Sequence, residues 1–212
     1  MGAATAWPGL VAVILAGGGG TRLGGQDKPM LPVAGVPMLD RVLAAVEGAA
    51  LRIVVGPPRE GLPTGVRTVR EEPPGAGPAA ATAAALGLVP RAASEDQAEA
   101  EEGPALVGLF AADLPYLTTE GVEILLAAVE SHADGAVFVD GRGKRQLLCG
   151  VWRAGALRDA VERLGAPEGR SMRAVLDGLD VVEVEWTGSG PAPYFDCDTE
   201  EDLRRADGGG DR

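Results

Sequence analysis

The segment from Val11 to Pro32 constrains the fold of this chain more than any other. It begins with an apolar run, Val11 to Ala16, and four glycines follow at once at positions 17 to 20. A short apolar run bounded by glycines predicts a buried strand of a parallel sheet. Glycines after such a strand permit positive φ angles, and their N–H groups can form a concavity for an anion. Because Arg22 and Lys28 add positive charge, we expect this segment to hold a polyphosphate.

Two common phosphate-binding motifs do not match this segment. A Walker A loop requires Ser or Thr after its lysine, but Lys28 is followed by Pro29. The dinucleotide fingerprint requires a third glycine at the position of Arg22, which argues against a dinucleotide-dependent oxidoreductase. The alternative is an ordinary surface loop in a chain with 32 glycines, but that does not account for Arg22 and Asp27-Lys28 at this spacing.

Strand and helix patterns alternate along the rest of the chain. Alternation of this kind predicts a three-layer α/β/α fold, Rossmann-like, with a mostly parallel sheet and helices on both faces. We expect a single domain over residues 8–206. The acidic stretch 91–104 lacks apolar periodicity and is expected to be a solvated insertion, and 207–212 a disordered tail. Further strands are predicted at 51–55, 66–69, 105–111, 135–139, 147–152 and 181–186, with helices opening at 36–39, at Pro78, after Thr118 or Thr119, near 154–164 and 171–178, and after Thr199.

This topology makes a prediction about Asp113, which ends the apolar run 105–111. Loops after parallel strands meet at one edge of the sheet, where ligands bind. The glycine segment and Asp113 are therefore expected to lie together although they are distant in sequence. A carboxylate at the end of an apolar strand does not contribute to packing, and Asp113 is therefore a candidate Mg²⁺ ligand. The alternative is that Asp113 only favours a turn before Leu114-Pro115.

Charge and cysteine usage narrow the function classes. The net charge of −12 argues against a nucleic-acid partner. The longest apolar runs are too short to cross a bilayer, and the first ten residues lack the pattern of a signal peptide. Cys149 and Cys197 do not form a disulfide framework and are expected to be reduced thiols, so we expect a cytoplasmic protein without membrane contact.

The glycine segment resembles the nucleotidyltransferase signature L-A-G-G-x-x-x-R-M/L-G-x-D-K, and most closely that of the molybdenum cofactor guanylyltransferase (MobA-like) family. Ala112-Asp113-Leu114-Pro115 is similar to the C-D-x-P segment of that family, and Asp196 to Leu203 to its C-terminal D-x-D-T-P-E-D-L segment. The resemblance implies a nucleotide-diphospho-sugar transferase-like fold that joins GMP from GTP to a molybdopterin-type acceptor, with Mg²⁺ as cofactor. It also implies transient contact with other cofactor-assembly proteins.

The resemblance assigns roles to particular residues. Arg22, Lys28 and Asp113 would be catalytic, and Asp113 and Asp198 would hold Mg²⁺. Asp198 has the alternative of capping the last helix, Asp196 faces the same way, and Lys28 could instead pair with Asp27. The nucleotide would contact Leu15, Ala16, Gly17, Gly18, Lys28, Glu72, Gly77 and Asp113.

The sequence leaves open which residues recognise the base and the acceptor. Glu71 and Glu72 both follow the strand at 66–69, and Glu72 aligns better with the family acid for guanine. Gly56 stands where the family often has Asn, and Ala81 where it has Gly. The basic turn 142–146 could meet the acceptor phosphate or be a solvated hairpin, and Arg170 to Arg173 matches another family segment. A cytidylyltransferase on the same pterin, a phospholactate guanylyltransferase and a non-catalytic nucleotide-binding protein are the alternatives.

Overall fold

The computed structural model describes residues 6–17, 26–91, 105–129 and 132–208. Two predicted site residues, Gly18 and Arg22, and most of the predicted acidic insertion lie outside these ranges. The strands are β1 (Trp7–Leu15), β2 (Pro32–Val33), β3 (Val36–Pro37), β4 (Ala49–Val55), β5 (Val66–Val69), β6 (Leu106–Ala111), β7 (Gly135–Val139), β8 (Arg145–Arg153) and β9 (Val181–Glu185). The helices are η2 (Lys28–Met30, a 3-10 turn), α1 (Met38–Ala45), α2 (Pro78–Leu86), α3 (Thr119–Ala128), α4 (Ala154–Leu164), α5 (Met172–Leu176) and α6 (Glu200–Asp207).

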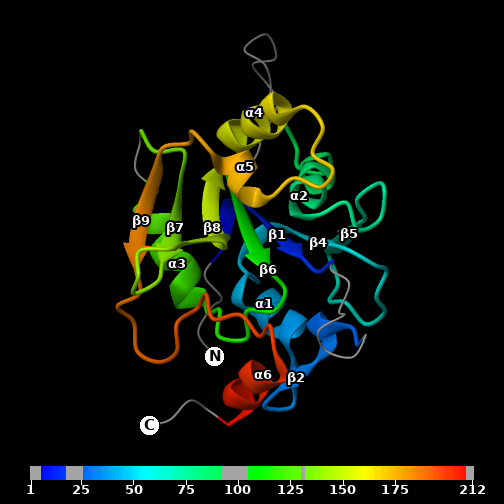
Figure 1. The fold of residues 1–212 in the computed structure, drawn as a ribbon, viewed down its shortest axis with the longest axis vertical. Coiled ribbons are helices and arrows are strands. Elements are labelled where there is room, and N and C mark those ends of the chain that lie inside the picture. The colour runs from blue at the N-terminus through cyan, green and yellow to red at the C-terminus, as the bar shows by residue number, and fades with distance from the viewer. Residues whose placement is uncertain (1–5, 18–25, 92–104, 130–131, 209–212) are drawn as a thin grey trace.

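The central sheet confirms the predicted fold class. In the described part of the chain, seven strands pair in the order β5-β4-β1-β6-β8-β7-β9 (Figure 1). Neighbouring strands are parallel except around β8, which runs antiparallel to both β6 and β7. Strands β1 and β6 are direct neighbours, so the segments that follow them leave the sheet side by side.

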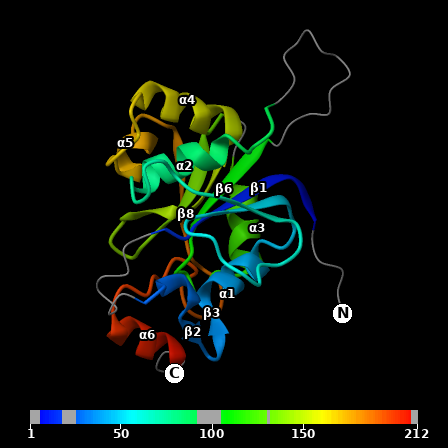
Figure 2. The same ribbon diagram turned by 90° about the vertical axis from the view of Figure 1, so that its right-hand side faces the viewer.

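The two faces of the sheet are covered by different helices (Figure 2). Side chains alternate along β1: Leu10, Ala12 and Ile14 face the layer of α1 and α3, whereas the residues between them face α2, α4 and α5. The sequences of these helices explain why they cover the sheet. In α1 and α3, apolar residues recur at helical spacing and form a buried face. The alanine-rich sequence of α2 favours a helix and provides a small apolar surface.

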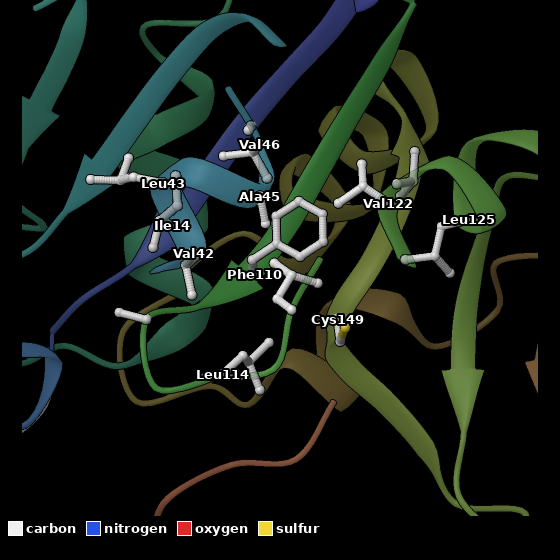
Figure 3. Close-up of a cluster of buried hydrophobic side chains, with 14 of the residues drawn as sticks. Ile14, Val42, Leu43, Ala45, Val46, Phe110, Leu114, Val122, Leu125 and Cys149 are labelled. Atoms are coloured by element: carbon white, nitrogen blue, oxygen red, sulfur yellow. The ribbon is translucent and has the colours of Figure 1, made fainter. Parts of the chain in front are cut away.

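Phe110 anchors the strand that leads to Asp113. Its ring is 0% exposed and lies between Val42 of α1, together with Val46 directly after that helix, and Val122 of α3 (Figure 3). Close packing of a large aromatic ring leaves little freedom to the strand that carries it. The core therefore fixes Phe110 near the end of β6, three residues before the candidate metal ligand Asp113.

Some local predictions are wrong. Val36 and Pro37 form β3, paired with β2, and the helix begins only at Met38. The tail does not begin at Asp207, because this residue ends α6 and its carboxylate accepts a hydrogen bond from the Ala34 N–H at 2.6 Å. The short β2–β3 hairpin determines the structure at Val36 and Pro37, and the contact with Ala34 determines it at Asp207. Neither feature produces a periodic pattern in the sequence.

None of the described helices is long and apolar enough to cross a membrane.

Both cysteines are expected to be chemically inert in the native protein. Cys149 and Cys197 are 1% and 0% exposed. Burial raises the pKa of both thiols, and together with the charges of Asp113 and Asp202 it raises that of Cys197 to about 12. A colorimetric disulfide reagent should label neither thiol at pH 8 and both after unfolding in guanidinium. Rapid labelling of the folded protein would contradict this burial.

Candidate active site

A lysine and two aspartates converge at the carboxyl edge of the sheet. Lys28 Nζ lies 2.5 Å from Asp113 Oδ2 and 2.7 Å from Asp198 Oδ1. Asp113 follows β6, and the ladder to β1 continues past the strands because Ala112 N–H donates to Leu15 O at 3.1 Å. The predicted meeting of the glycine segment with Asp113 is confirmed at Lys28. The alternative pairing of Lys28 with Asp27 is wrong, since Asp27 pairs with Arg59 instead.

The C-terminal segment brings Asp198 to this edge. Cys197 N–H donates to the backbone oxygen of Asp113 at 3.2 Å, which places the two aspartates side by side. Thr199, not Asp198, caps α6: the Thr199 hydroxyl accepts from Asp202 N–H, and the Asp202 carboxylate accepts from Thr199 N–H. The alternative that Asp198 is the cap is therefore wrong, and its carboxylate points to Lys28.

The acidic side chains at this edge influence Lys28 and one another. Partial burial lowers the pKa of Lys28, but the Asp113 and Asp198 carboxylates outweigh it and raise that pKa above its usual value. Desolvation and the charges of Asp198 and Asp113 raise the pKa of Asp196. Within the described ranges Asp113 and Asp198 both contact the Lys28 ammonium, and two carboxylates that meet in this way suit a cation.

The carboxylates fit a divalent metal that also binds phosphate. In the described part of the chain no three His, Cys, Asp or Glu side chains form a complete metal cluster. Mg²⁺ does not require one, because it is commonly held by one or two carboxylates, with waters and substrate phosphates as the other ligands. Asp113 and Asp198, which converge on one ammonium, are a pair of this kind.

The residues before the glycine run are already bonded to the sheet. Ala16 N–H donates to Val55 O at 2.8 Å, and Leu15 O accepts from Ala112 N–H. Gly17 is exposed. The roles of Leu15, Ala16 and Gly17 in contacting a nucleotide stay predictions, and Gly17 is the most accessible of the three.

The two acids after β5 occupy different environments. Glu71 is 5% exposed; its Oε1 accepts from Gly75 N–H at 2.9 Å and lies 3.6 Å from the position a Cβ would take on Gly17. Its Oε2 is buried and has no hydrogen-bond partner among the described residues. Glu72, which the sequence favoured for the base, is exposed. The acid packed beside Gly17 is therefore Glu71, and the assignment of Glu72 to the base stays a prediction.

Gly56 allows the end of β4 to approach the start of the glycine segment. Its φ is +150°, and a Cβ on Gly56 would lie 2.8 Å from Ala16 O. We expect Gly56→Ala to lower the free energy of unfolding by about 1–3 kcal/mol, measured by guanidinium titration. Gly155→Ala, at an open position in α4, is the matched control and should be neutral or slightly stabilising. Unchanged stability of Gly56→Ala would refute the close approach.

Gly77 directly precedes a helix, and the basic turn lies between two strands, as the sequence predicted. Gly77 has φ +95° and precedes α2, and a Cβ there would lie 3.8 Å from Arg170 O, so the segment before α2 lies against Arg170. Residues 140–144 form the turn of the β7–β8 hairpin, and this end of the hairpin extends beyond the end of β6. Its turn is held by Asp140, whose Oδ1 accepts from the N–H groups of Arg142 and Lys144 at 2.9 Å.

Arg59 was missed by the sequence reasoning. It donates to both carboxylate oxygens of Asp27 and to Ala16 O. The only available signal was its place in the loop directly after β4, at the ligand edge of the sheet.

Comparison with known proteins decides the family. The model of the MobA-like NTP transferase domain matches residues 12–184. The chain belongs to the MobA-like NTP transferase family. It is 32% identical over 201 residues to the molybdenum cofactor guanylyltransferase of Rhodobacter capsulatus, covering 93% of this chain and 95% of that protein. It is 34% identical over 187 residues to a probable molybdenum cofactor guanylyltransferase of Mycobacterium tuberculosis H37Rv, covering 86% of each.

A solved structure of molybdopterin-guanine dinucleotide biosynthesis protein A from Archaeoglobus fulgidus has the same fold, with a TM-score of 0.68, 19% identity, and coverage of 93% of this chain and 97% of that one. The MobA-like match begins inside β1 and ends inside β9, so it spans the whole central sheet. Asp196 and Asp198 lie beyond the matched residues, and their place at the site rests on the geometry given above.

Proposed function

We propose that this chain transfers GMP from GTP to the terminal phosphate of a molybdopterin-type acceptor. An acceptor phosphate oxygen attacks the α-phosphorus of GTP, the bond from that phosphorus to the bridging oxygen breaks, and pyrophosphate leaves with the electron pair. The observation that carries the proposal is the contact of Lys28 with Asp113 and Asp198 at the ligand edge of a MobA-like fold.

The chain's own residues would hold the triphosphate and neutralise its charge. Lys28 would act as a point charge on phosphate oxygens, and Arg22 could bind them with two parallel hydrogen bonds. Asp113 and Asp198 would hold Mg²⁺, which supplies charge neutralisation at the phosphates when it is bound. Gly17, Gly18 and the segment before α2 at Gly77 would approach the nucleotide closely through their backbones.

Guanine would be selected by an acid after β5. A carboxylate can accept from the N1–H and N2–H₂ donors of guanine, and cytosine lacks that pair of donors. The exposed side chain of Glu72 can turn toward a base, whereas Glu71 is fastened to Gly75 N–H and supports the turn beside Gly17. Glu72→Gln should therefore reduce the preference for GTP over CTP, while Glu71→Gln should chiefly reduce stability.

The test is pyrophosphate release measured with each nucleotide and each acceptor. With Mg²⁺ and molybdopterin, GTP should support turnover and CTP should not; phospholactate should not replace molybdopterin. Turnover with CTP alone would favour a cytidylyltransferase, and turnover with phospholactate the other guanylyltransferase. GTP binding without turnover on any acceptor would indicate a non-catalytic nucleotide-binding protein. Calorimetric titration of Mg²⁺ into the GTP complex tests the metal separately, and Asp113→Asn should weaken that binding.

A further inference from the structure

Arg59 contacts two residues of the glycine segment, Ala16 before the glycine run and Asp27 after it. Its Nη2 donates to Ala16 O at 2.8 Å and to Asp27 Oδ1 at 2.7 Å, and its Nε donates to Asp27 Oδ2 at 2.9 Å. The side chain is only 5% exposed. A two-point contact between guanidinium and carboxylate is strong and fixes relative orientation, and burial protects it from screening by salt.

Asp27 connects this contact to Lys28. It directly precedes η2, and its backbone oxygen accepts from Met30 N–H at 2.8 Å, so Lys28 sits on a short hydrogen-bonded turn. The Asp27 carboxylate does not cap that turn, because Arg59 engages both of its oxygens. The turn is held on its other side as well, where Met38 N–H donates to Leu31 O at 3.1 Å. Arg59 thus determines where the turn begins and in which direction Lys28 leaves it.

We propose that Arg59 is a positioning residue for Lys28 and acts through Asp27. It holds Asp27 against the end of β1, and this directs the Lys28 ammonium to Asp113 and Asp198. The consequence for catalysis rests on the proposed function, in which Lys28 meets the phosphates. The structural part of the proposal does not, since it concerns only where the Lys28 ammonium lies.

The chain offers matched comparisons for this contact. Arg158 is half-buried and, like Arg59, donates to backbone oxygens, those of Leu86, Val89 and Pro90, but it lies on the α2–α4 side of the sheet, away from Lys28. Arg158→Gln should therefore cost stability as Arg59→Gln does without affecting Lys28. Lys28 and Lys144 are the two lysines of the chain, so Lys144, in the exposed hairpin turn, is an internal reference.

The test measures acetylation of Lys28 relative to Lys144 by mass spectrometry after brief treatment with acetic anhydride, without nucleotide. Arg59→Gln and Asp27→Asn should each raise this ratio at least about threefold, because the Lys28 ammonium loses its fixed ion pairs. The double variant should show no further increase, since both residues act through one contact. Arg158→Gln should keep the wild-type ratio.

Asp27→Asn keeps the Arg59 bond to Ala16 O, so it tests the proposal even if Arg59→Gln fails to fold. A wild-type ratio in folded Asp27→Asn, or additive increases in the double variant, would overturn the proposal. In the enzyme assay, both single variants should raise the KM for GTP about tenfold or more with a smaller change in kcat, as a misplaced binding group does. Absence of turnover in the wild type would refute the proposed function and leave the acetylation result to decide on Arg59.

Discussion

Replacing Asp113 by asparagine should lower kcat/KM for GTP by about 10³-fold or more, because a metal at the phosphates and preorganised charge are each worth several kcal/mol of transition-state stabilisation. The substitution preserves the size of the side chain but removes the charge that faces Lys28 at 2.5 Å and that we propose holds Mg²⁺. Pyrophosphate release under saturating acceptor measures the loss, and Asp113→Ala should behave in the same way.

The fold should survive this change. Asp113 follows β6, its side chain is 18% exposed, and its backbone oxygen still accepts from Cys197 N–H in the variant. Circular dichroism and the thermal midpoint provide the check. Asp159→Asn, at an exposed position on α4, is the matched control and should keep full activity. Full turnover by a folded Asp113→Asn variant would remove Asp113 from the proposed mechanism.

Replacing Lys28 by alanine should lower kcat/KM for GTP by about 10²–10³-fold, the range observed when one stabilising donor is removed from an active site. The variant loses a cation that would meet the triphosphate, and it leaves the Asp113 and Asp198 carboxylates without the ammonium that both contact. Like charges at short range repel an anionic substrate, so the KM for GTP should rise while kcat falls.

Two further variants test what the Lys28 side chain contributes beyond its positive charge and whether the effect is specific to this lysine. Lys28→Arg keeps the positive charge but replaces a point charge by a planar fork, so we expect it to recover only part of the lost activity. Lys144→Ala removes the other lysine, and it should leave the KM for GTP unchanged. A Lys28→Ala variant with the wild-type KM for GTP would show that this ammonium serves the fold and not the nucleotide.

The architecture was predictable because its signals are local and periodic. The strands at 66–69 and 135–139 and the helix at 154–164 have the predicted bounds, and Thr118 and Thr199 cap the helices that were predicted to follow them. The approach of Asp113 to the glycine segment also followed from the sequence, since neighbouring parallel strands must end at one edge.

The partners of individual charges were not predictable. Asp27 and Lys28 are adjacent and of opposite sign, yet they pair with Arg59 and with Asp113 and Asp198 respectively. Glu71 and Glu72 are chemically alike, and only the turn after β5 determines that the first is buried beside Gly17. Adjacent side chains of an extended segment point to opposite sides, so the fold, and not the residue type, decides which one reaches the site.

The most direct test is a crystal structure of this chain with GTP and Mg²⁺. We expect a triphosphate that extends from Gly17 to Lys28, with a metal ion bound by Asp113 within coordination distance of a phosphate oxygen. A nucleotide bound at another edge of the sheet, or a metal ion that does not touch Asp113, would contradict the account.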